Sequence, residues 1–315
     1  MSKNASRATS ASADEESIDS LASLASSEFY EALGWARRLA PSALFSACMQ
    51  SKLRGFAKQV IEFDRDVARL TLPLAANRLV SRELPPMLID GASRIPQRGP
   101  TLLVANHPGL FDALAIATVV KRDDLAIVVK EQPYWDLLPN LSRKLFTVPP
   151  SRPGRVRVAR QVLEHLQQNM SVLLFPGGQI ERDHESALSC SFPIEKWSSL
   201  PEWLMVQVPN LRIATIAIGG VMSRRVRSHP ICNLRMTYRD RDWLAATIQF
   251  FMRRHDDVRI KLCVGKARSI ADISQEHVRL QLHHDMRLQL RKLKRLAKRS
   301  STIPSSCVAG ESALA

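Results

Sequence analysis

The chain has 315 residues, of which 45% are hydrophobic and 24% are charged, and its formal net charge is +15. This composition is ordinary for a globular protein and excludes a fibrous or fully disordered chain; the length allows one large domain with helical additions, or two domains. The positive surplus favours an anionic partner, which can be phospholipid headgroups, nucleic acid or an acidic carrier protein.

The cysteines and the hydropathy limit the cellular setting. Five cysteines are scattered without any Cys-x-x-Cys pair, so we expect a reducing compartment and neither a zinc site nor a disulfide framework. The N-terminus has no apolar core of the kind found in signal peptides, and no uninterrupted apolar run approaches the roughly 20 residues that span a bilayer. If this protein meets a membrane, we expect it to lie on the surface.

The first quarter of the chain changes character at about residue 29. Residues 1–28 are low in complexity, with five acidic residues against two basic ones, which predicts a disordered tail. Residues 29–84 show apolar positions at spacings of three and four, interrupted by Pro41, which predicts at least two helices. These helices form either a hairpin that packs on the main domain or a membrane-facing element, because Leu53 and Phe56 are interleaved with Lys52 and Arg54.

Residues 85–270 alternate short apolar runs with longer amphipathic segments. The expected strands are 101–105, 125–129, 172–175, 213–218 and 259–264, and residues 156–170 have the apolar face of a helix. Strands that alternate with helices predict an α/β domain with a mixed, largely parallel sheet flanked by helices.

The C-terminal part predicts a basic amphipathic helix over residues 271–300. Residues 275–300 contain eight Lys or Arg residues against two acids, with apolar positions at helical spacing. This helix is either docked by one edge with a solvated basic face or adsorbed to anionic lipid. Residues 301–315 are expected to be a disordered tail.

The most informative motif is Asn-His-Pro-Gly-Leu-Phe-Asp at 106–112, between the strand 101–105 and a helix-compatible stretch. A neutral imidazole accepts a proton from a hydroxyl, and a nearby carboxylate fixes its tautomer. With its lead-in of Gly, Ile-Pro and Gly-Pro, the motif resembles the His-x4-Asp signature of the phospholipid/glycerol acyltransferase family. The resemblance implies that His107 is the general base, that Asp112 orients it and that Asn106 contacts substrate. Alternatively, His107 is an ordinary loop histidine, and Asp112 is an acid in the first turn of a helix that interacts favourably with the helix dipole.

A second stretch, 172–182, resembles the third block of that family, Phe-Pro-Glu-Gly-Thr-Arg. It has Phe175, Pro176 and Gly178 in place, but Gly177 and Gln179 replace the Glu and Thr, and an isoleucine replaces the Arg. A Pro-Gly-Gly turn lets backbone amides approach a ligand closely. The resemblance implies that residues 175–179 bind substrate.

The missing acid and Arg of this block have possible replacements just beyond it. Glu181 and Arg182 follow the block directly and can substitute, Glu181 as a further substrate-binding residue. The alternative is an ordinary turn that ends a strand. The departure puts recognition of a glycerol-phosphate acceptor in doubt.

The segment 146–155 resembles the second block of the family, which ends in an Arg that binds acceptor phosphate. Arg152 and Arg155 stand at that place in this sequence. Both residue type and position suit phosphate binding, because a guanidinium matches phosphate oxygens bidentately and the start of a helix adds a favourable dipole. The alternative is that both are solvent-exposed arginines. Residues 213–221 match the place of the fourth block, so the resemblance covers roughly residues 88–225.

The resemblance implies a membrane-surface O-acyltransferase that moves a fatty acyl group from acyl-CoA or acyl carrier protein to a hydroxyl of a lysophospholipid or related lipid. We expect no metal, no cofactor beyond the acyl donor and no nucleic-acid partner, and a cytoplasmic protein that lies peripherally on the inner face of an anionic membrane. The alternative is a non-catalytic member of the same family that binds lipid or acyl chains.

Overall fold

The structure is a computed structural model that describes residues 2–34, 43–183, 194–273 and 277–300. Its centre is a seven-stranded sheet with the order β1-β7-β6-β2-β5-β3-β4. All neighbouring strands pair in parallel except β6 and β7, which are antiparallel. The predicted mixed, largely parallel sheet is confirmed. The strands are β1 (Leu88–Asp90), β2 (Thr101–Ala105), β3 (Leu125–Lys130), β4 (Leu145–Val148), β5 (Ser171–Leu174), β6 (Arg212–Gly219) and β7 (Lys261–Val264).

The five strands expected from the sequence lie within two residues of the observed ones, but β1 and β4 were not expected. Both are short and lie at the two edges of the sheet. Their residues are exposed or half-buried, so they lack the continuous apolar run that marks the central strands.

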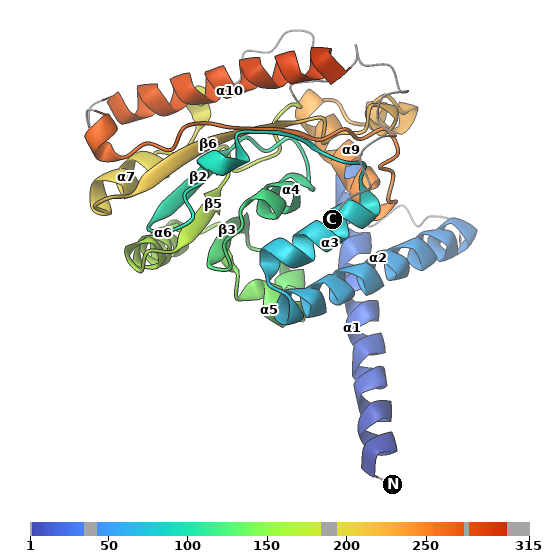
Figure 1. Ribbon diagram of the computed structural model, residues 1–315. Helices are drawn as coiled ribbons and strands as arrows, with labels where there is room; N and C mark the ends of the chain where they lie inside the picture. The colour runs from blue at the N-terminus through green and yellow to red at the C-terminus, as the bar shows by residue number, and fades with distance from the viewer. Residues whose placement is uncertain (1, 35–42, 184–193, 274–276, 301–315) are drawn as a thin grey trace, which may run out of the picture.

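Alternate residues of the central strands face two separate hydrophobic cores. Leu103 of β2 and Ile216 of β6 belong to one core, and Leu102 and Ala217 of the same strands belong to the other. The first core is closed by α1 (Ser2–Leu33), α2 (Ala43–Arg69), α3 (Leu72–Glu83), α4 (Asp112–Val119) and α9 (Tyr238–Phe251). The second is closed by α6 (Arg152–Gln167), α7 (Leu200–Gln207) and α10 (Val278–Ser300), and Figure 1 shows α10 on the opposite side of the sheet from α2 and α3. The short helices α5 (Pro139–Ser142) and α8 (Arg224–Arg227) lie in the connections.

Helix α1 corrects the expectation of a disordered tail over residues 1–28. Its described side chains include a buried apolar stripe with Leu21, Ala25 and Phe29. The acids that suggested disorder face the basic residues of α2: Glu15 lies 2.6 Å from Arg54, and Asp14 contacts Arg65. Low complexity is therefore compatible with a helix here, because α2 supplies both apolar and ionic partners.

Where their side chains are described, the two helices considered as membrane-binding elements bury most of their apolar residues inside the protein. Leu53 and Phe56 of α2 are buried in the first core, and Leu282, Met286 and Leu290 of α10 are buried against β6 and β7. Helix α10 is thus present as expected and is docked by its apolar edge, with a basic outer face. None of the helices, as far as the structure describes them, has a stretch long and apolar enough to cross a bilayer. The expected tail at 301–315 lies outside the described residues.

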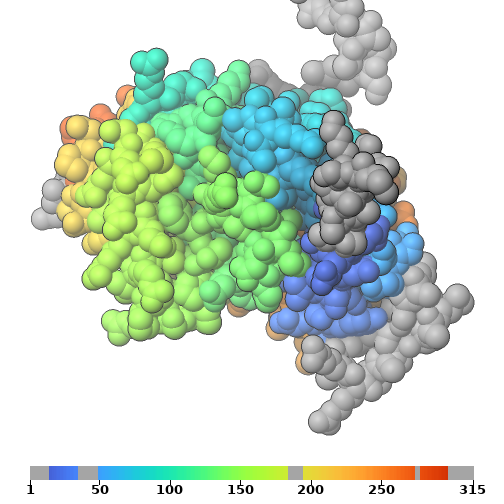
Figure 2. All heavy atoms as spheres, turned by 90° about the horizontal axis from the view of Figure 1, so that it is seen from below, coloured from blue at the N-terminus to red at the C-terminus, as the bar shows by residue number. Residues whose placement is uncertain are grey.

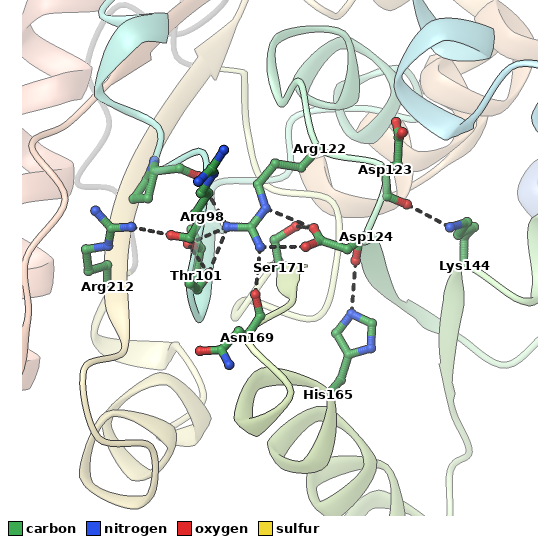
Figure 3. A network of polar contacts seen from close by, with 12 residues as sticks. Arg98, Thr101, Arg122, Asp123, Asp124, Lys144, His165, Asn169, Ser171 and Arg212 are labelled. Atoms are coloured by element: carbon green, nitrogen blue, oxygen red, sulfur yellow. Dashed lines mark hydrogen bonds and ion pairs between the residues drawn. The ribbon is translucent and has the colours of Figure 1, made fainter.

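A polar network joins the amino-terminal ends of three central strands (Figure 3). The buried guanidinium of Arg122 donates to Asp124 Oδ2 at 2.6 Å, to Thr101 Oγ1 at 3.0 Å and to the carbonyl of Asn169 at 2.9 Å. The Ser171 hydroxyl donates to Asp124 Oδ1 at 2.7 Å. Because Thr101 begins β2, Ser171 begins β5 and Asp124 directly precedes β3, the network aligns these strands at the end opposite to the site described next.

Candidate active site

His107 and Asp112 meet at the carboxyl end of β2. The strand ends at Ala105 and α4 begins at Asp112, so the motif forms the turn between them. Nδ1 of His107 lies 2.6 Å from Oδ2 of Asp112. The Asp112 carboxylate also accepts hydrogen bonds from the backbone amides of Gly109, at 3.2 Å, and Ala113, at 2.7 Å. These bonds hold a fully buried carboxylate in one orientation against the imidazole.

The contact assigns the two ring nitrogens of His107 different roles. An ionised Asp112 carboxylate only accepts hydrogen bonds, so Nδ1 of the neutral ring carries the proton and Nε2 keeps a free lone pair. Burial lowers the pKa of His107, but the charge of Asp112 and its hydrogen bond together raise the pKa by more than burial lowers it. The pKa of His107 is therefore above its ordinary value. The ring is therefore a stronger base than an ordinary histidine. Its side chain is 23% exposed, which leaves it accessible from one side.

That side is a cavity of about 1420 Å³, which His107 and Asp112 line together with mostly apolar residues. Phe175, at the end of β5, stacks on the His107 ring with centroids 4.6 Å apart. Walls come from α1, α2, α9 and the 133–145 segment, and Figure 2 shows the face on which α1 and α2 lie beside that segment. The aromatic lining includes Phe56, Phe63, Tyr134, Trp135, Trp203, Trp243, Phe250 and Phe251. A cavity of this size and character accommodates an acyl chain.

The third block places its turn beside His107. Phe175, Pro176, Gly178 and Gln179 line the cavity, as expected of substrate-binding residues, but Gly177 does not. An added Cβ at Gly177 would lie 2.6 Å from Oε1 of Glu181. A side chain at position 177 would therefore collide with the Glu181 carboxylate.

Glu181 is bound to the backbone of the His107 turn. Its Oε2 accepts from the amide of His107 at 2.9 Å, and its own amide donates to the His107 carbonyl at 2.6 Å. Its Oε1 accepts from the indole Nε1 of Trp197 at 2.8 Å. Burial raises the pKa of Glu181, and the bonds from Trp197 and from the His107 amide oppose this rise. The residue expected to contact substrate does not line the cavity and instead braces the imidazole-bearing turn.

Asn106 also differs from its expected role. It is fully buried and does not line the cavity. Its Nδ2 donates to the carbonyl of Ile218 and its Oδ1 accepts from the Ile218 amide, both at 2.8 Å. The expected substrate contact is corrected to a tie between β2 and β6, because both polar ends of the amide are already used by the neighbouring strand.

Arginines surround the opening of the cavity. Arg152 and Arg155 occupy the first turn of α6, are exposed and line the cavity, as does Arg160 one turn later. The Ser151 hydroxyl caps this helix by accepting from the amide of Gly154. A helix start with exposed guanidinium groups suits a phosphate, as the sequence predicts.

The sequence did not predict that α9 and the residues leading into it line the cavity. Arg239, Trp243 and Phe250 line the cavity, although they lie far beyond the motifs. Trp197, which holds Glu181, was also missed. The only local signal is the cluster of aromatic residues at 243–251, which does not tell a core helix from a cavity wall. Among the described residues, no group of three His, Cys, Asp or Glu side chains is placed to hold a metal ion.

Residues 87–200, which contain the His107 turn, the start of α6 and the third block, match the model of the family described as Acyltransferase. This part of the chain is thus similar to acyltransferases. Among solved structures, the chain is similar to the 1-acyl-sn-glycerophosphate (LPA) acyltransferase PlsC from Thermotoga maritima, with 15% identity and a TM-score of 0.43. That similarity covers 71% of this chain and 78% of the other. No curated protein is found to match the chain.

Proposed function

We propose that this protein is an acyltransferase that moves a fatty acyl group from an acyl thioester, acyl-CoA or acyl carrier protein, to a hydroxyl of a lysophospholipid or related lipid at a membrane surface. The observation that supports it most is the pairing of His107 with a buried carboxylate at the wall of a large apolar cavity. The paired side chains suit proton transfer, and the cavity suits the acyl chain.

In the proposed mechanism His107 is the general base and Asp112 positions it. Nε2 of His107 takes the proton of the acceptor hydroxyl while the hydroxyl oxygen attacks the thioester carbonyl. A C–O bond forms, the C–S bond breaks, and the imidazolium returns its proton to the departing thiolate. The Asp112 carboxylate stabilises the imidazolium that exists between these steps. The acyl group passes directly to the acceptor, so no cofactor beyond the donor is required.

The substrates are expected to be anionic. In this proposal Arg152 and Arg155 bind a phosphate of the acceptor or donor, and the turn formed by Pro176, Gly178 and Gln179 binds the polar part of the substrate; their positions in the cavity lining support this. The positive surplus of +15 suits an anionic headgroup, the phosphates of CoA or an acidic carrier. We place the protein peripherally on the cytoplasmic face of an anionic membrane.

The test measures transfer by purified full-length protein with a panel of acyl donors and lyso-lipid acceptors. His107→Ala is expected to lower kcat by roughly 10²- to 10⁴-fold, the usual contribution of a general base. His284→Ala is the control, because His284 is exposed on the outer side of α10 and lies outside the cavity lining. Wild-type activity in His107→Ala would refute the proposed base.

A second candidate is a non-catalytic member that binds lipid or acyl chains, and the divergent third block favours it. In the same experiment, a wild-type protein that binds lipid saturably but transfers no acyl group from any donor would support this alternative.

A further inference from the structure

Where their side chains are described, the helices α2 and α10 bury most of their apolar residues, and α10 exposes a single large one, Leu280, at 63%. An adsorbing surface needs apolar side chains that are free to enter the lipid interface as well as cationic ones. The structure offers both in residues 224–241, which run from α8 through the turn at Pro230–Leu234 into the first turn of α9. We call these residues the arginine segment; it runs into α9, which Figure 1 labels.

The arginine segment exposes large apolar side chains next to one another. Met236 is 94% exposed, Tyr238 is 64% exposed and Leu234 is 57% exposed. Isolated exposed apolar residues are common on protein surfaces, but three within five positions form a patch. The segment also contains six arginines against one acid, Asp240.

The backbone between these apolar residues is extended. Arg235 and Thr237 both have extended φ and ψ angles, and side chains alternate along an extended chain. Arg235 points inward, because an added Cβ at Gly34, the end of α1, would collide with its guanidinium. The side chains at positions 234, 236 and 238 are all exposed, whereas Arg235 between them is half-buried.

Cations accompany this apolar patch. The guanidinium groups of Arg182 and Arg241 lie over the Tyr238 ring, 5.0 Å and 5.8 Å from its centroid. Within the segment, Arg227 pairs with Asp242 and Arg235 pairs with Asp240. Arg224, Arg225 and Arg239 are exposed and, within the described part of the chain, have no recorded ion pair with an acid. Their charge is available to an external anion.

The segment adjoins the cavity that holds the candidate dyad. Arg239 and Asp240 line that cavity, and Arg182, which stacks on Tyr238, directly follows Glu181. The segment thus contributes to the wall of the cavity that is proposed to hold the acyl chain, so a membrane contact at this place lies next to the substrate site.

We propose that the arginine segment is the surface by which this protein docks on an anionic phospholipid bilayer. The proposal rests on the proposed function only in that the bilayer supplies the lipid acceptor. Exposed Met, Leu and Tyr side chains fit the interfacial region of a bilayer, and unpaired arginines fit its anionic headgroups. An acidic carrier protein would satisfy the arginines but would leave the apolar patch without a matching partner.

The experiment is sedimentation of the full-length protein with vesicles of phosphatidylcholine, with and without phosphatidylglycerol. The test variant combines Leu234→Ser and Met236→Ser with Arg224→Gln and Arg225→Gln. We expect it to bind the anionic vesicles at least about tenfold more weakly than wild type, since apolar and cationic contributions are both removed. The matched control combines Leu280→Ser with Lys292→Gln and Lys294→Gln on α10, which remove an exposed apolar residue and two exposed charges elsewhere.

The outcomes separate the docking proposal from the proposed function. A test variant that sediments like wild type, or a control that loses binding equally, overturns docking by the arginine segment. Transfer between short-chain substrates that are dissolved as monomers should be unchanged in the test variant, which also shows that it is folded. If the variant keeps vesicle binding and loses transfer from acyl carrier protein alone, the segment binds a carrier and the bilayer proposal is overturned. Absence of transfer by wild type affects only the proposed function, because sedimentation does not depend on it.

Discussion

The residue that most changes the interpretation of the site is Glu181. Its carboxylate lies against Gly177, the position at which the family pattern has an acid, and accepts hydrogen bonds from the His107 amide and Trp197. The replacement acid therefore comes four positions after the place that it fills. Gly177 is required there because the carboxylate takes the space of its missing side chain.

We predict that Glu181 positions His107 and that its substitution lowers kcat more than it raises KM. Glu181→Ala leaves two partly buried donors, the His107 amide and the Trp197 indole, without their acceptor, which corresponds to a tenfold to hundredfold loss of rate, on the order of 1–3 kcal/mol. Gly177→Ala should have a similar effect, because the new methyl group displaces the carboxylate.

The readout that distinguishes positioning from mere stability is the titration of His107 by NMR. The charge of Glu181 raises the pKa of His107, so Glu181→Gln should lower this pKa while the protein stays folded. Gln179→Ala, at a cavity-lining position, is the control and should change KM with little effect on the His107 titration. Unchanged kcat and an unchanged His107 pKa in Glu181→Ala would refute the role.

At the scale of elements, α1 is part of the cavity wall rather than a tail. Leu21, Ala25 and Glu28 of this helix line the cavity, and its acids pair with α2. Most of the stabilisation of such a helix comes from the packing of its apolar face. The shape of the cavity therefore depends on the docking of α1.

We predict that docking of α1 weakens as pH rises from about 5 to 8. Burial and the nearby charge of Glu31 raise the pKa of Glu28 from its ordinary 4.5 to about 7. A carboxyl whose pKa is raised by folding stabilises the fold fully below its unfolded value, and this contribution is lost as pH rises toward 7. Its size is about 1–3 kcal/mol once partial exposure to solvent is allowed for.

Hydrogen exchange of the α1 amides, corrected for intrinsic rates, measures this effect. Protection in wild type should fall between pH 5 and pH 8, and Glu28→Gln should remove the dependence. Glu16→Gln is the control on the same helix, because Glu16 is exposed. A pH-independent wild type would contradict the prediction.

At the scale of the whole molecule, the candidate site and the Arg122 network lie at opposite ends of the sheet. The carboxyl ends of β2 and β5 hold His107 and Phe175, whereas their amino ends are joined through Arg122 and Asp124. The Arg122 network ties the strands that carry the site without occupying it.

We predict that Asp124→Asn destabilises the fold by about 1–3 kcal/mol at pH 7, because the buried Arg122 loses its ionised partner. Burial opposes ionisation, but hydrogen bonds from Arg122 and Ser171 hold the pKa of Asp124 below its ordinary value. A lowered pKa stabilises the fold above the unfolded value, and this contribution is lost as pH falls through the folded value. The variant and wild type should therefore converge in acid.

Urea unfolding at pH 7 and in mild acid measures this difference. Asp123→Asn is the control, because the Asp123 side chain is exposed one residue away. Equal midpoints for Asp124→Asn and wild type at pH 7 would show that the network does not stabilise the fold.

The sequence by itself determined the features that depend on neighbouring residues. Hydrophobic periodicity located the five inner strands and the helix at 152–167, and the spacing of His107 and Asp112 predicted their pairing, because a short turn keeps both side chains within reach. Hydrophobic periodicity did not predict the edge strands or the helix at 2–33, since their burial depends on partners far away in the chain.

Only the tertiary structure decided which surfaces are covered. Asn106 hydrogen-bonds to β6, and Glu181 hydrogen-bonds to the backbone of the His107 turn. The apolar faces of α2 and α10 pack in the two cores. A helix with one apolar face has the same pattern whether that face meets a sheet or a membrane, because the pattern records the need for an apolar partner and not its identity. The identity of the partner is set by contacts between segments distant in sequence, and these exist only in the fold.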